Sequence, residues 1–213
     1  MICVSIASEG LDACMKALDG VDFAEIRLDK TKLSDEEVKK VFSLPKKLIA
    51  TFRENNIASE DERKRALMIA IDAGASMVDV ELEGREEYRK EIVEKAKEKG
   101  CSIIISHHDY DKTPQREELL RIVDNCFEKG ADIAKVACKA NSVQDSARLL
   151  GLLDSEKKLV VIAMGEYGRI TRVAGPLLGS QFTFASQSSG KETAPGQLER
   201  KTMEELLKTI EGS

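Results

Sequence analysis

One lysine lies in the middle of a short apolar run, Ile133-Ala134-Lys135-Val136-Ala137. A run of this length is typical of a buried strand, and lysine is almost never fully buried unless a partner or a reaction uses it. An apolar environment favours the neutral amine, which is a nucleophile. Lys135 is therefore a candidate for covalent catalysis. On this run alone, the alternative is a lysine paired with a carboxylate at a strand end.

Polar residues also lie at the ends of other strand-like runs. Many of them are two residues apart, which places them on the same side of a strand. They are Glu25 and Arg27, Thr51 and Arg53, Asp79 and Glu81, Ser106, His107 and His108. Burying so many polar groups is costly unless they are paired or used. Acids, guanidinium groups, a histidine and a lysine together indicate acid/base chemistry on a polar substrate. The alternatives are salt-bridged strand ends, or a metal held by Asp79, Glu81 and His108.

The two histidines are adjacent, so on a continuing strand they face opposite sides, and periodicity leaves open which one faces the site. Arg172 follows the run that ends at Met164 and falls in the first turns of a helix, where it can bind a carboxylate or phosphate bidentately or simply lie at the surface. The polar segment 187–197 contains glycine and serine and is long enough to close over a site.

Strand-like runs alternate with helical segments along the whole chain. The runs are Ile2–Ile6, Phe23–Leu28, Leu48–Phe52, Met77–Leu82, Ser102–His107, Ile133–Ala137, Leu159–Met164 and Phe182–Ala185. Eight such units with short links predict a parallel sheet, and at this count a closed barrel is favoured over an open sheet. We therefore predict an α/β protein, with residues 1–213 forming a single (β/α)8 TIM barrel domain, in which sites gather at the C-terminal ends of the strands.

Several helix ends can be predicted from local signals. Ser34 with Glu37 and Ser59 with Glu62 fit capping boxes, and Thr113 before Pro114 fits a helix start. The last helix is expected to bury one face, Met203, Leu206, Leu207 and Ile210. Glycines that precede strands fit left-handed positions at helix ends; they are Gly20, Gly74, Gly100 and Gly130.

Composition narrows the class of protein. The chain has 213 residues, of which 42% are hydrophobic, and its net charge of −5 favours neither nucleic acid nor an anionic membrane as a partner. The five cysteines are dispersed and odd in number, which indicates reduced thiols in a cytoplasmic protein. No apolar run is long enough to span a membrane. The chain has neither a Gly-x-Gly-x-x-Gly nor a Walker motif, and we expect no cofactor and no metal.

These residues, in this order and spacing, resemble the type I 3-dehydroquinate dehydratases, the Schiff-base dehydroquinases of the shikimate pathway. The resemblance covers nearly the whole chain. It is carried by Glu25-x-Arg27, Thr51-x-Arg53, Asp79-x-Glu81, Ser106-x-His108-Asp109, Lys135, Met164-Gly165, Thr171-Arg172-x-Ala174-Gly175, Gly179-Ser180-x-x-Thr183-Phe184 and Ala194-Pro195-Gly196-Gln197.

The resemblance implies a fold, a reaction and residue roles. The fold is a (β/α)8 barrel, and the reaction is dehydration of 3-dehydroquinate to 3-dehydroshikimate. Lys135 would form an imine with the C3 ketone, and His108 would take the C2 proton and then help the C1 hydroxyl leave. Glu25, Arg27 and Arg53 would hold ring hydroxyls and place the ketone. Arg172 and Gln197 would bind the carboxylate, and the homologous enzymes suggest a homodimer.

The sequence departs from the family pattern at two places. Thr193 stands where the closing loop usually has serine; threonine keeps the hydroxyl, so the resemblance still implies that this position binds substrate. After Arg53 the family usually has a glutamate before a Gly-Gly, which orients the histidine, but here the chain reads Glu54-Asn55-Asn56-Ile57-Ala58. Glu54 or Glu60 are alternatives for that role, and Glu62 is expected to serve its cap.

Two other functions are compatible with this pattern. A class I Schiff-base aldolase of a sugar phosphate also uses a barrel lysine, and it would need a phosphate site near Gly179-Ser180. A catalytically silent barrel acting as a binding protein is the alternative from another class, and the missing glutamate favours it. An assay for the conjugated enone product distinguishes the dehydratase from both.

Overall fold

The computed structural model describes residues 1–54 and 58–212. Contacts divide the chain into two compact units. The N-terminal unit is Ser5–Ile105, and the C-terminal unit is Met1–Val4 with Ser106–Ser213. Two strands, β1 (Ile2–Ile6) and β5 (Ser102–Asp109), are shared between the units. The prediction that residues 1–213 form one domain stays a prediction.

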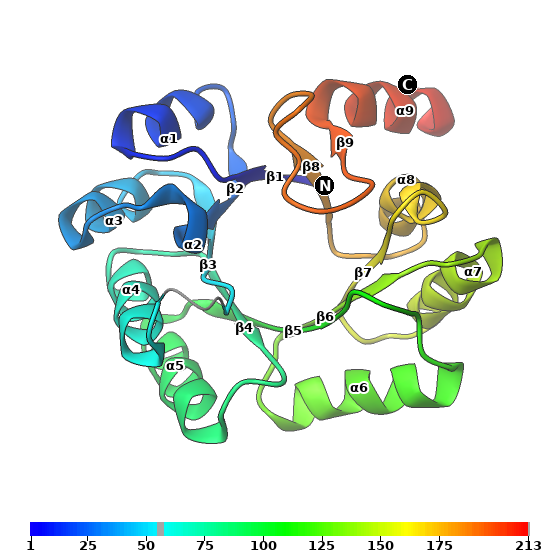
Figure 1. Cartoon of the computed structure of the whole chain (residues 1–213), viewed down its shortest axis with the longest axis horizontal. Helices are drawn as coiled ribbons and strands as arrows, with labels where there is room; N and C mark the ends of the chain where they lie inside the picture. The colour runs from blue at the N-terminus through cyan, green and yellow to red at the C-terminus, as the bar shows by residue number, and fades with distance from the viewer. Residues whose placement is uncertain (55–57, 213) are drawn as a thin grey trace. The chain divides into compact units, whose positions relative to one another are not determined.

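The N-terminal unit alternates strands with helices, which cover one side of its strands (Figure 1). Its elements are α1 (Leu11–Ala17), β2 (Phe23–Arg27), α2 (Leu28–Thr31), α3 (Asp35–Phe42), β3 (Lys47–Thr51), α4 (Glu60–Asp72), β4 (Met77–Glu81) and α5 (Glu86–Lys99). Within this unit β2, β3 and β4 are neighbours and run parallel. Their register aligns Arg27 with Thr51, and Thr51 with Asp79, so three polar positions form one row across the strands.

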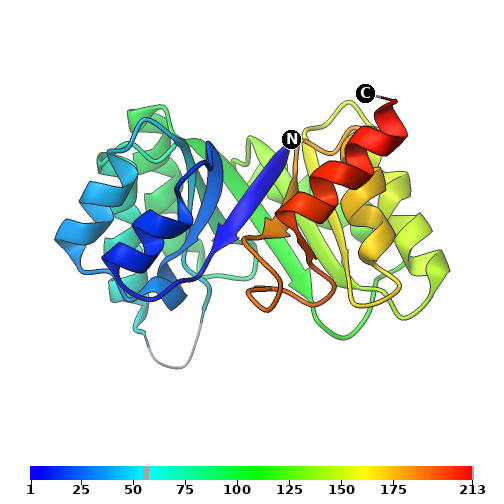
Figure 2. The same cartoon turned by 90° about the horizontal axis from the view of Figure 1, so that it is seen from above.

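The C-terminal unit repeats the same alternation. Its elements are α6 (Arg116–Glu128), β6 (Ile133–Lys139), α7 (Val143–Leu150), the 3-10 helix η1 (Gly151–Leu153), β7 (Leu159–Met164), α8 (Arg169–Leu177), β8 (Thr183–Ser186), β9 (Leu198–Glu199) and α9 (Arg200–Glu211). β6 pairs in parallel with β7, and β8 with β9. The yellow α8 and red α9 lie side by side (Figure 2), where Val173, Ala185, Met203 and Leu207 form a small core.

One predicted helix start and one predicted buried face differ from the structure. Both capping boxes form, at Ser34 and at Ser59. Thr113 is not the cap of α6: its hydroxyl donates to the Lys139 carbonyl (2.8 Å), and Gln115 is the N-cap instead. In α9 Met203 and Leu207 are buried, but Leu206 and Ile210 are 40% and 59% exposed, so the buried face is narrower than predicted.

The Ser59 cap gives a testable contribution to stability. The Ser59 hydroxyl accepts a hydrogen bond from the Glu62 backbone (3.2 Å), and the Glu62 carboxylate accepts one from the Ser59 backbone (2.7 Å). We expect Ser59→Ala to lower the free energy of unfolding by about 1 kcal/mol, because a backbone donor at the start of α4 loses its partner. Urea unfolding measures this change, and an unaltered midpoint would contradict the role of the cap.

Most of the described chain therefore follows a strand–helix repeat with parallel neighbours. No helix among the described residues is both long enough and apolar enough to cross a membrane.

Candidate functional site

Lys135 lies within β6, and its side chain is buried in the C-terminal unit, with the residue 5% exposed. Its Nζ atom lies 4.3 Å from the centroid of the Phe184 ring on β8. The face of an aromatic ring attracts a cation at this distance, and the attraction is stronger away from water. Lys139 ends the same strand and is exposed. Of these two lysines, only Lys135 has the buried environment that was predicted from the apolar run.

His107 and His108 lie near the end of β5, and both are partly buried. The His108 ring stacks on Tyr110, with 6.0 Å between centroids and 15° between planes. Tyr110 lies in the bend directly after β5, so the two rings meet where the strand ends. Asp109 accepts hydrogen bonds from the backbones of Asp111 and Lys112, both at 2.9 Å, and so shapes the turn that follows.

Arg172 is the largest fully buried side chain of the described residues, at 1% exposure on α8. Its Nη1 donates to the Phe184 carbonyl (3.4 Å), and its Nη2 donates to the Pro195 carbonyl (3.1 Å). Its Nε is buried without a hydrogen-bond partner, and no carboxylate of residues 1–54 or 58–212 pairs with it. Burial lowers the pKa of Arg172 to about 10, so the guanidinium remains charged at neutral pH.

This environment makes Arg172 suited to an anion. A buried guanidinium without a carboxylate partner is unfavourable, and an anionic ligand would relieve that cost. Because Nε is the donor that lacks a partner, a carboxylate or phosphate oxygen is the chemistry that fits it.

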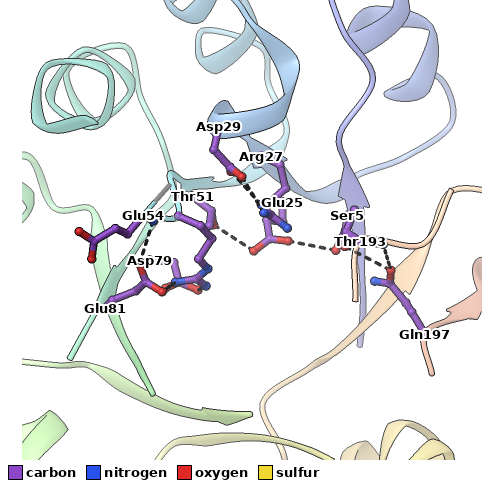
Figure 3. Close-up of polar contacts among 11 residues, drawn as sticks. Ser5, Glu25, Arg27, Asp29, Thr51, Glu54, Asp79, Glu81, Thr193 and Gln197 are labelled. Atoms are coloured by element: carbon purple, nitrogen blue, oxygen red, sulfur yellow. Dashed lines mark hydrogen bonds and ion pairs between the residues drawn. The ribbon is translucent and has the colours of Figure 1, made fainter. Parts of the chain in front are cut away.

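The segment 187–197 carries two of the predicted site residues. The Gln197 Oε1 atom accepts hydrogen bonds from the Thr193 backbone (2.7 Å) and the Thr193 hydroxyl (3.2 Å), as Figure 3 shows. Gln197 is buried. The hydroxyl of Thr193, which stands where serine is usual, therefore has a hydrogen-bond partner within the same segment.

In the N-terminal unit, Glu25 on β2 is a buried carboxylate (Figure 3). It accepts hydrogen bonds from the Ser5 hydroxyl and the Thr51 hydroxyl, both at 3.0 Å. These donors come from β1 and β3, the neighbours of β2, so the strands themselves orient the carboxylate.

Arg27 and Arg53, the two guanidinium groups of this unit that were predicted as site residues, are each held by acids. Arg27 donates to both oxygens of Asp29, at 2.9 Å from Nε and 2.7 Å from Nη2. Arg53 donates to Asp79 (2.6 Å) and lies 3.8 Å from Glu81. Burial lowers the pKa of both arginines, but these neighbouring carboxylates raise it more, and the net pKa of each is raised.

The acids that follow Arg53, where the sequence departs from the family pattern, have partners other than a histidine. The Glu54 carboxylate lies 3.5 Å from Arg63, and Glu60 accepts from Arg85 at 3.2 Å. Glu62 serves the Ser59 cap, as predicted. The rest of that departure, Asn55 to Ile57, lies outside the described residues.

Several contacts around these residues were not predicted from the sequence. They involve Ser5, Asp29, Tyr110 and Phe184. Asp29 and Tyr110 lie only two residues from Arg27 and His108, but both follow the end of a strand, so the alternation of sides along a strand does not predict these contacts. Ser5 and Phe184 come from other strands, and their contacts depend on pairing and packing.

Comparison with known proteins shows which proteins this chain is similar to. The model of the family "Type I 3-dehydroquinase" matches residues 2–213. A 3-dehydroquinate dehydratase of Methanocaldococcus jannaschii is 36% identical over 99% of both chains. The type I 3-dehydroquinate dehydratase of Clostridium difficile, solved with covalently modified comenic acid, is 27% identical with a TM-score of 0.88, over 99% of this chain and 92% of that one.

A second solved structure extends the likeness. The 3-dehydroquinate dehydratase of Aquifex aeolicus is 30% identical, with a TM-score of 0.82, over 99% of this chain and 98% of that one. These likenesses confirm the predicted fold class, an α/β chain of the (β/α)8 barrel type.

Proposed function

We infer the function from one premise, that the chain belongs to the type I 3-dehydroquinase family. It is a carbon–oxygen lyase that dehydrates 3-dehydroquinate to 3-dehydroshikimate, a step of the shikimate pathway. The observation that carries this conclusion is the match of residues 2–213 to a single family model. The substrate is a hydroxylated ring that bears a ketone and a carboxylate, which suits the lysine and the buried arginine of the C-terminal unit.

We propose a Schiff-base route through Lys135. The Nζ lone pair attacks the C3 ketone carbon, and loss of water leaves an iminium. His108 removes the C2 proton, and the C–H electron pair forms the C2=C3 bond of a neutral enamine. The enamine then expels the C1 hydroxyl, which leaves as water with the proton from His108. Hydrolysis of the conjugated iminium releases the product and restores the amine.

The other predicted site residues are proposed to bind substrate. Arg172 and Gln197 hold the carboxylate, with Thr193 orienting the Gln197 amide. Glu25, Arg27 and Arg53 contact the ring hydroxyls and place the ketone. The buried Nε of Arg172 supports the first assignment, and the covalently modified comenic acid of the Clostridium difficile relative supports a covalent route.

The direct test of the function is an absorbance assay with 3-dehydroquinate. The product has a conjugated enone, whose ultraviolet absorbance should rise with time and enzyme concentration. A flat trace from folded protein would reject the proposal and favour a silent barrel acting as a binding protein. Turnover of a sugar phosphate in its place would favour the aldolase.

Arg172 should contribute strongly to substrate binding. We expect Arg172→Ala to raise KM and to lower kcat/KM, because the substrate carboxylate loses a buried charged partner. The loss of transition-state stabilisation should be roughly 2–4 kcal/mol. Steady-state kinetics of the purified variant measure this effect.

The matched control for that variant is Arg169→Ala. Arg169 begins the same helix α8 but is exposed, so its removal should change kcat/KM by less than about twofold. An unchanged KM for Arg172→Ala would remove Arg172 from the substrate site.

We also propose a cytoplasmic location and a homodimer, as the composition and the family suggest. Size-exclusion chromatography with light scattering tests the second of these, and a monomeric mass would reject it.

A further inference from the structure

We propose that Gly196 is a positioning residue: its backbone, seated against Gly165, fixes the Pro195 carbonyl that Arg172 holds and the Gln197 side chain that follows. The inference deepens the proposed function and rests on it, because it concerns how the substrate carboxylate is held. Gly196 itself is not proposed to contact the substrate. It acts through its two neighbours in the chain.

The contact between the two glycines leaves no room for a side chain. The Gly165 backbone N–H donates to the Pro195 carbonyl at 3.3 Å. A Cβ atom built on Gly196 would lie 2.5 Å from the Gly165 carbonyl oxygen, a separation that real Cβ atoms essentially never show. Gly196 also has a φ of 74°, and Gly165 has a φ of 86°, both in the region that favours glycine. At Gly165, the residue after β7, segment 187–197 thus makes a close contact of backbone against backbone.

The carbonyl at this contact is shared with the buried arginine. The Pro195 oxygen accepts from the Gly165 backbone and also from Arg172 Nη2, at 3.1 Å. The other terminal nitrogen of Arg172 donates to the Phe184 carbonyl. Two backbone oxygens therefore fix the plane of the guanidinium, and one of them belongs to the loop. The direction in which the partnerless Nε atom points depends on where Gly196 holds that oxygen.

The residue on the other side of Gly196 is Gln197, whose amide oxygen is already fixed by Thr193. A shift of the backbone at Gly196 would therefore displace both predicted carboxylate ligands, Arg172 and Gln197. The position of the loop and the binding of the carboxylate are coupled, and such coupling is reciprocal. We therefore expect a bound carboxylate to hold the loop in place.

The test compares Gly196→Ala with Gly190→Ala. Gly190 lies in the same loop at a φ of 79°, but a Cβ atom there would meet nothing within 4 Å, so it reproduces the backbone strain without the clash. We expect Gly196→Ala to raise KM for 3-dehydroquinate by about tenfold or more, with kcat lowered less than about threefold. Gly190→Ala should change KM by less than about threefold.

A pair of inhibitors distinguishes positioning from a general loss of structure. One is a hydroxylated cyclohexene carboxylate, and the other is the same ring without the carboxylate. In the wild type the carboxylate should tighten binding, and in Gly196→Ala most of that advantage should disappear. An undiminished advantage in Gly196→Ala would overturn the inference, whereas a wild type that fails to turn over 3-dehydroquinate would reject the proposed function instead.

A second variant and a second readout keep the test decisive if Gly196→Ala folds poorly. Gly165→Ala tests the same contact from the β7 side. Its Cβ would come no nearer than 3.8 Å to another atom, but its φ of 86° is strained for alanine, so the Gly165 backbone that meets Gly196 should shift and KM should rise in the same direction. In the wild type, the carboxylate inhibitor should also slow protease cleavage within residues 187–194 more than its counterpart does. Equal cleavage with both inhibitors, or an unchanged KM in Gly165→Ala, would contradict the inference.

Discussion

Replacing Lys135 with alanine is expected to abolish turnover, with kcat falling by roughly 10⁵-fold or more. Removing the nucleophile of a covalent enzyme has an effect of this size, because no other group can form the intermediate. Lys135 is buried beneath the Phe184 ring, so no solvent-exposed lysine can take its place. The enone absorbance assay measures the loss, and thermal unfolding shows whether the variant remains folded.

The control for this variant is Lys139→Ala on the same strand. Lys139 is exposed at the end of β6, and its side chain should be an ordinary surface lysine. Its removal should leave kcat within about twofold of the wild type. Substantial turnover by Lys135→Ala would contradict the assignment of the nucleophile.

His108→Ala should have the next largest effect, slowing proton transfer by about 10²–10⁴-fold in kcat. Imine formation should remain possible, since Lys135 is intact, so this variant should still bind substrate covalently while turning it over slowly. Pre-steady-state trapping combined with steady-state kinetics separates these two properties.

His107→Ala is the natural comparison, because the two histidines are adjacent on β5. It should be milder, since adjacent residues of a strand face opposite sides. If His107→Ala proves more damaging, the assignment of the strand's facing is wrong by one residue.

Much of the fold could be predicted from local signals. The strands Ile2–Ile6 and Leu159–Met164 have the predicted bounds, because apolar runs with clear ends mark buried strands. β6 was predicted to stop at Ala137 but continues to Lys139, which pairs with Met164. Backbone pairing extends a ladder past the point where side chains become polar, so hydrophobicity alone ends such strands too early.

The same limit applies to helix starts. Thr113 has the right type and spacing to cap α6, but its hydroxyl is used by the Lys139 carbonyl, 26 residues away. Similarly, Leu206 and Ile210 fit a helical stripe in α9, yet they are exposed. A periodic pattern shows which residues share a face, whereas the width of the buried stripe depends on what packs against it.

For the site, the sequence indicated the reactive residue types but not their partners. Lys135 was identified because a lone charge interrupts an apolar run, a signal that needs no structure. The acids that hold Arg53, the ring beside Lys135 and the carbonyls that fix Arg172 are tertiary contacts, whereas Asp29 is a near neighbour of Arg27 in the chain. Spacing along one strand cannot reveal contacts that depend on other elements.

The measurement that tests the central claim most directly is borohydride reduction in the presence of substrate or product. If Lys135 forms an imine, reduction should inactivate the enzyme and leave the ligand on one lysine, which peptide mass spectrometry should locate at Lys135. The variant Lys135→Ala should show no such adduct. A ligand mass on Lys139, or no ligand-dependent mass at all in an active enzyme, would contradict the Schiff-base mechanism.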